Sequence, residues 1–235
     1  MLKKLYLLAI VSLFFFPKMS NCQNHDFEVS RNPGDFEEIV VSGKFDVEII
    51  PTEESEKVEY TVEGIKDEDI IVENRNGEMT LKVKFTKLLT KDYVVYARIY
   101  YKDINKVIVE NGAEATLTDN KKRKRIMIGS NSGATIKYTG ESTSLELNTK
   151  AGGVINAFGS CKYLEASSNT GGSIFAFNMI ASNVDANLKA GGDIEVTALE
   201  KIDARVSLGG TITYKGNPAV VNQKTTLGGN VISKN

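Results

Sequence analysis

Apolar and polar residues alternate along most of the chain, and the alternation is most regular after residue 110. There, a pair of very small residues, usually Gly-Gly, recurs at intervals. Apolar side chains stand two and four places after each pair, with mostly polar ones between them. The position two places after the pair is filled by Ala115, Ile136, Ile155, Ile174, Ile194, Ile212 and Val231. A period of two predicts a strand with one buried face.

A second alternating row precedes each pair. The position eight places before it holds Ile126, Leu145, Leu164, Val184, Ile202 and Val221. Six places before it the residues are again apolar, except that Gln223 breaks the pattern. Six places after the pair stand Gly140, Gly159, Asn178, Ala198 and Gly216. Gly and Asn tolerate positive φ, so each unit predicts two strands, a Gly-Gly corner and a second corner.

The unit repeats about every nineteen residues between 111 and 235. The second members of the small pairs stand at 113, 134, 153, 172, 192, 210 and 229, so their spacing runs from 18 to 21. Such a period predicts a solenoid, whose stacked coils bury continuous apolar columns. We therefore predict an all-β protein with a parallel β-helix. A β-sandwich of hairpins is the main rival, because about 20 residues can also form one hairpin.

Residues 35–110 lack this repeat but also predict strands. Phe45–Ile49 and Val58–Val62 alternate cleanly, and Asn76-Gly77 separates two strand-like segments. Asn-Gly between such segments is a strong hairpin signal. A solenoid needs protection for the open edge of its first coil. We interpret this part as a β-rich cap that is continuous with the array.

The first 34 residues have a different character. Lys3 and Lys4 precede an apolar run from Leu5 to Phe16, which Pro17 ends. This pattern predicts a secretory signal over residues 1–22, because the run is shorter than the ~20 residues that span a bilayer. Residues 23–34 are interpreted as a tether. Cys22 stands where bacterial lipoproteins carry their lipid, although cleavage just after it is an open alternative.

The overall charge of the chain says little about the kind of molecule that it binds. The chain has 29 Lys and Arg against 30 Asp and Glu, a net charge of −1, so no overall field attracts nucleic acid. Five consecutive basic residues, Lys121–Arg125, are interpreted as a solvated corner between coils or as a contact for phosphate or sulfate on surface glycans. No aromatic residues are interleaved there, and we predict no nucleic-acid partner.

Residue groupings that could support catalysis are few in this sequence. The densest acidic site is Asp193 and Glu195, and the predicted register places no second carboxylate beside them on neighbouring coils. We therefore predict no metal site, no cofactor and no enzymatic activity. Cys161 is interpreted as a small buried hydrophobe, since the single imidazole, His25, lies in the tail.

Three aromatic residues fall at outward positions. Phe158, Phe175 and Phe177 stand at odd offsets from their Gly pairs, so they share one predicted face. Exposed apolar patches usually mark interaction surfaces. The alternative is that a third short strand or the loops of the cap cover them.

With these residues in view, the chain resembles a known family. Phe36–Ile49, the Gly77–Val83 segment and the repeated small-Gly-x-Ile units are similar to the auto-transporter adhesin, head GIN domain family. The resemblance implies an exported protein of Gram-negative bacteria with a single-stranded right-handed β-helix. The family usually has a Pro where this chain reads Tyr101-Lys102-Asp103, a difference that concerns one turn.

The resemblance and the residues together predict a non-catalytic binding or scaffolding protein of the cell envelope. Its role would be adhesin-like, its partner a surface glycan or a protein, and its location the outer membrane or cell surface. Secretion or a periplasmic location, an enzyme acting on envelope polysaccharide, and a purely structural lipoprotein are the alternatives.

The Cys22 hypothesis has a direct test. Lipidation would hold the mature protein at a membrane by ~0.8 kcal/mol per buried methylene. We expect intact-mass analysis of the native protein to show acyl chains on Cys22. A mature chain that starts at unmodified Gln23 would instead establish ordinary cleavage.

Overall fold

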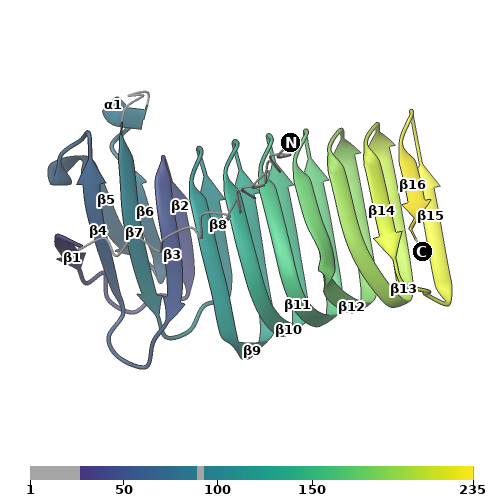
Figure 1. Cartoon of the computed structure of the whole chain (residues 1–235), viewed down its shortest axis with the longest axis horizontal. Coiled ribbons are helices and arrows are strands. Elements are labelled where there is room, and N and C mark those ends of the chain that lie inside the picture. Colours follow the sequence, from purple (N-terminus) through teal and green to yellow (C-terminus); the bar gives the residue numbers. More distant parts are fainter. Residues whose placement is uncertain (1–26, 89–92, 235) are drawn as a thin grey trace, which may run out of the picture.

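The described part of the chain, residues 27–88 and 93–234 of a computed structural model, is almost entirely strand. It forms a β-solenoid of about seven turns with parallel strands, as Figure 1 shows. This confirms the predicted all-β parallel β-helix and excludes the sandwich of hairpins, since the successive repeats pair in parallel with one another.

The repeats form long bent strands, each nearly one whole coil. They are β9 (Glu114–Asn131), β10 (Thr135–Lys150), β11 (Val154–Asn169), β12 (Ser173–Ala190) and β13 (Asp193–Leu208). The last coils use shorter strands, namely β14 (Thr211–Lys215), β15 (Val220–Thr225) and β16 (Asn230–Ser233). Each long strand crosses from one sheet of the solenoid to the other (Figure 1).

Two sheets face each other across the core. Sheet 1 contains the part of each coil that follows the Gly turn, and sheet 2 contains the part that precedes the next turn. The register keeps equivalent residues together, for example Ile136 beside Ile155 in sheet 1 and Leu145 beside Leu164 in sheet 2. These inward residues are at most 2% exposed, so the predicted columns are the core.

The two predicted corners are built differently. The Gly turn places two successive residues in the left-handed region, for example Ala151 (φ 48°) and Gly152 (φ 76°). The second corner is a bend inside each long strand, and pairing continues on both sides of it with a register shift in several coils. Asn178 and Ala198 stay outside the left-handed region. Gly159 (φ 121°) is required there, because a Cβ atom would lie 2.0 Å from the carbonyl oxygen of Gly140.

The N-terminal part consists of shorter elements. They are β1 (Val29–Arg31), β2 (Glu38–Ser42), β3 (Phe45–Pro51), β4 (Lys57–Glu63), the 3₁₀ turn Asp67–Asp69, β5 (Ile70–Arg75), β6 (Glu78–Val83), α1 (Phe85–Leu88), β7 (Val94–Tyr101) and β8 (Lys106–Glu110). The hairpin predicted at Asn76-Gly77 joins β5 to β6.

This part both extends and closes the solenoid. In sheet 1, β9 pairs with β3, and β3 pairs with β7. In sheet 2, β9 pairs with β8, β8 with β2, and β2 with β6. All of these pairs are parallel. The β2–β3 pair therefore lies between β6–β7 and β8–β9, out of chain order. Antiparallel β4 and β5 then cover the last parallel strands, and β1 covers β4.

A buried carboxylate secures the place where this out-of-order chain path turns. Glu56, just before β4, is 4% exposed. Its carboxylate accepts hydrogen bonds from the backbone N–H of Phe36 (3.0 Å) and of Lys102 (2.9 Å). It thereby joins the entry to β2, the entry to β4 and the connection from β7 to β8. Buried backbone donors need such partners.

The predictions for the N-terminal tail meet the structure only in part. The signal segment 1–22, with Cys22, lies outside the described residues. Within the predicted tether, residues 29–31 are strand β1 and pair with β4. No helix among the described residues is long and apolar enough to cross a membrane.

Neighbouring residues on β11 test the register. Ile155 is fully buried, whereas Asn156 is half-buried on the outward side beside Lys137. We expect Ile155→Asp to unfold or strongly destabilise the protein, because an unpaired buried charge costs several kcal/mol. Asn156→Asp, the matched control, should change stability by less than about 0.5 kcal/mol. Thermal melts compare them, and equal melting temperatures would contradict the register.

Candidate functional site

The three aromatic residues singled out in the sequence lie together on the outward side of sheet 1. Phe158 stands on β11, and Phe175 and Phe177 stand on the next strand, β12. Phe175 is 38% exposed, and the other two rings are half-buried. We call these three residues the aromatic face. No element of the described chain fully covers them.

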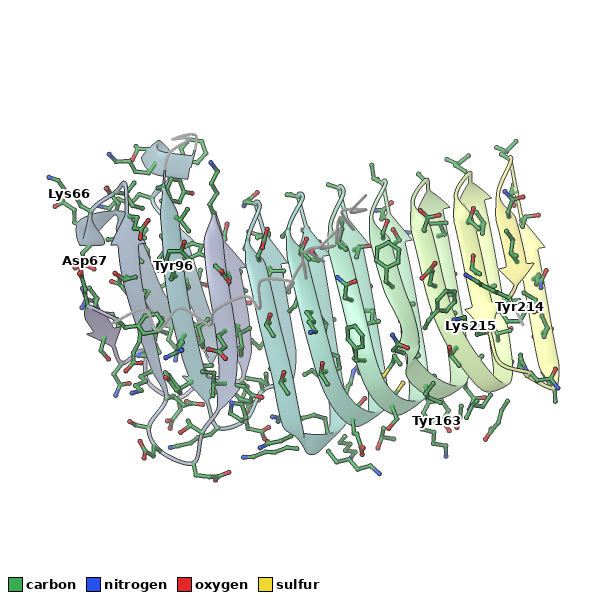
Figure 2. All side chains as sticks on the ribbon, viewed as in Figure 1. Lys66, Asp67, Tyr96, Tyr163, Tyr214 and Lys215 are labelled. Carbon is green, nitrogen blue, oxygen red and sulfur yellow. The ribbon has the colours of Figure 1, made fainter. Side chains whose placement is uncertain are left out.

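Lysine side chains flank the aromatic face. The Lys137 ammonium lies 5.5 Å from the centre of the Phe158 ring, and that of Lys215 lies 4.2 Å from the centre of the Phe177 ring. Lys234 approaches the same Phe177 ring at 5.6 Å. These are cation–π distances. Figure 2 shows Lys215 on β14, two coils from the strand that carries Phe177.

A bulge explains how Phe177 reaches so far. Ala176 and Ile180 of β12 pair with Val196 and Thr197, which are consecutive on β13, so residues 177–179 have no partner there. The Thr197 hydroxyl donates a hydrogen bond of 2.8 Å to the carbonyl oxygen of Phe177. The sequence carries a signal of this bulge, because the repeat lengthens to 20 residues between positions 172 and 192.

The basic run lies at the second corner of its coil, as predicted, but one of its five side chains is not solvated. It lies within β9, and Arg123 is 6% exposed. The Arg123 guanidinium pairs with the buried carboxylate of Asp119 (2.5 Å) and also with Asp103. Lys122 and Lys124 alone in the run face solvent without a partner in the described chain. The predicted solvated corner is therefore correct for Lys122 and Lys124 and wrong for Arg123, because the bend turns that one side chain into the core.

The acidic pair on sheet 1 has the neighbours that the register predicted. Asp193 lies between Ser173 and Thr211, and Glu195 lies between Phe175 and Thr213. Beside these two residues no further carboxylate stands in register.

A different column of carboxylates, missed in the sequence, runs along the outward side of sheet 2. Four acidic residues occupy equivalent positions on successive coils, namely Glu146, Glu165, Asp185 and Asp203. All four stand seven places before the second residue of a Gly pair. The repeat therefore contained a sign of this column, because an odd offset is an outward position. Arg125 pairs with the first, and Arg205 and Lys201 pair with the last two. Within residues 27–88 and 93–234, no three acidic, His or Cys side chains are grouped to hold a metal ion.

Cys161 occupies the interior, as its isolation in the sequence suggested. It is 8% exposed, and burial raises the pKa of its thiol to about 12. The thiol therefore stays protonated at neutral pH and is a poor nucleophile.

This geometry defines a class: a parallel β-solenoid with an aromatic face on one sheet and a column of acids on the other. The family described as "Putative auto-transporter adhesin, head GIN domain" matches residues 35–218, and the chain belongs to this family. No curated protein matches the chain.

Solved structures share the fold. An adhesin-type protein from Bacteroides fragilis is 18% identical, with a TM-score of 0.77, over 88% of this chain and 95% of that one. A second, from Parabacteroides merdae, is 21% identical, with a TM-score of 0.69, over 88% and 95%. A protein from Parabacteroides distasonis, described as lipid binding, is 18% identical, with a TM-score of 0.66, over 88% and 96%.

The buried ion pair gives a testable contrast within the basic run. Removing Arg123 leaves the Asp119 carboxylate buried and unpaired, which costs about 3–5 kcal/mol. We expect Arg123→Ala to lower the free energy of unfolding by that amount in urea titrations. Lys122→Ala, one residue away on the exposed side, should change it by less than about 0.5 kcal/mol. Equal losses would show that Arg123 is not part of the core.

Proposed function

We propose that this chain is an exported, non-catalytic binding protein of the cell envelope with an adhesin-like role, and that it contacts its target through the aromatic face. The observation that carries the proposal is the outward aromatic face, in which Phe175 is exposed and Phe158 and Phe177 are half-buried, in a protein that belongs to an adhesin family. Large exposed apolar groups on a soluble surface usually mark interaction sites.

The composition of the face indicates what it would contact. Phenylalanine rings supply apolar area, and the lysines above Phe158 and Phe177 supply positive charge beside it. Such a surface suits a glycan with anionic groups or an acidic patch on a protein. Phe158 and Phe175 stand on strands that pair with a neighbour on each side, so their backbone is already ordered before binding.

Location follows from the same proposal. An adhesin-like protein must leave the cytoplasm, in agreement with the signal pattern of residues 1–22. We propose the outer membrane or cell surface of a Gram-negative bacterium as its place, with Cys22 as the lipid attachment site.

The chemistry of the acids supports a non-catalytic role. A general acid in polysaccharide cleavage needs a carboxyl with a raised pKa. Hydrogen bonds from Lys201 and Asn222 instead hold the pKa of the Asp203 carboxyl below its usual range. Arg205 holds Asp185 in an ion pair. The purified protein should release no product from a panel of chromogenic polysaccharides.

Replacing the aromatic face tests the proposal. We expect Phe158→Ser, Phe175→Ser and Phe177→Ser, combined, to abolish binding of the protein to surfaces coated with mucin, with collagen or with bacterial cells. Their rings are outward, so the melting temperature should fall only slightly.

Glu114→Ser is the matched control, because this position is exposed and outward on sheet 1 but lies on β9, two coils from the strand that carries Phe158. This control should bind like the unmodified protein. A large loss of stability in the triple variant would show that the rings belong to the core. Unchanged binding would place the contact elsewhere.

A further inference from the structure

The outward side of sheet 2 carries a groove that the aromatic face does not explain. Its volume is about 340 Å³, and it crosses four consecutive coils, from β10 to β13. One column along it consists of Ser144, Tyr163, Asn183 and Lys201, and the next consists of Glu165, Asp185 and Asp203. Leu164 and Val184, which stand between the two columns, complete the lining.

Tyr163 is the aromatic element of this groove. It is 47% exposed, and its neighbours in register, Ser144 and Asn183, are smaller. Figure 2 shows it at the edge of the array where the long strands bend. The Lys162 ammonium lies over the ring, 5.1 Å from its centre, so the opposite face of the ring is the apolar platform that stands beside the polar wall.

The carboxylates of the groove are held in place yet retain capacity to bind. Asn187 donates to Asp185 (2.6 Å), and Asn222 donates to Asp203 (2.7 Å). Glu165, two residues from Tyr163 on the same strand and face, has no hydrogen bond or ion pair within the described chain. A carboxylate has about four acceptor positions, so each of these groups can accept further hydrogen bonds.

We propose that this groove binds a linear, neutral polysaccharide chain laid along the solenoid axis. Sugar hydroxyls are donors that carboxylate and amide oxygens accept, and the apolar face of a sugar ring packs on an aromatic ring. The carboxylates repel an anionic chain. Lys201 pairs with Asp203, and Arg205 pairs with Asp185. These ion pairs lower the net negative charge of the groove, so its attraction for a polycation is reduced.

The spacing of the coils fits such a chain. Neighbouring strands lie about 4.8 Å apart, which is similar to the length of one sugar unit in an extended polysaccharide. Successive sugars would thus meet equivalent polar positions on successive coils. Four coils form the groove, so affinity should rise with chain length to about four sugars and then level off.

Calorimetric titration with soluble oligosaccharides of two to six sugars tests this site. The probes are xylo-, cello- and manno-oligosaccharides as neutral chains, oligogalacturonate as an anionic chain and chitosan oligosaccharides as a cationic chain. We expect binding of at least one neutral series and none of the anionic chain. Tyr163→Ala should weaken that binding about tenfold, and Glu165→Gln several-fold, with unchanged melting temperatures.

Ser167→Ala is the matched control on the same strand, outside the groove lining, and should bind normally. The Phe158, Phe175 and Phe177 triple variant should also retain oligosaccharide binding, so failure of this site and failure of the proposed function are separate results. Absence of neutral binding at millimolar ligand, insensitivity to Tyr163→Ala, or binding of the cationic chain alone would each overturn the proposal.

Discussion

Parallel, in-register pairing between successive coils is the constraint on which the rest of this structure depends. Each coil hydrogen-bonds to the next at the same positions, so Ile155, Ile174 and Ile194 stack in one column of the core. Side chains alternate with a period of two, so a slip of one residue would expose the whole column. No coil buries its own apolar face, and stability comes from stacking.

The same register that fills the core also orders the surface. Outward residues repeat from coil to coil just as inward ones do, which is why four acids form a straight column on sheet 2. An exception such as the bulge at residues 177–179 therefore stands out and carries Phe177 across a neighbouring coil. The aromatic face and the groove at Tyr163 lie on different sheets, so each can act without the other.

Where the N-terminal part meets the regular array, the core becomes polar. Asp119 and Arg123 are buried there, with the Tyr101 ring 5.7 Å from the guanidinium. Burial raises the pKa of Tyr101 and of Tyr138, which both stay neutral. A buried ion pair contributes little net stability, but losing one partner is costly. Through Arg123 this layer joins β9 to the end of β7 at Tyr101 and to Asp103 in the connection from β7 to β8.

The sequence by itself determined the repeat, the inward columns and the Gly turns, because period-two patterns and small residues act locally along each coil. It also placed Phe158, Phe175 and Phe177 on one face, because residues an odd number of places after a Gly pair point outward when those at even numbers point inward. The sequence did not predict that β2 and β3 insert between strands that come later in the chain. Pairing between such distant segments depends on the whole stack of coils. The burial of Arg123 was decided in the same way: only the bend of β9 and the facing Asp119 distinguish it from the lysines beside it.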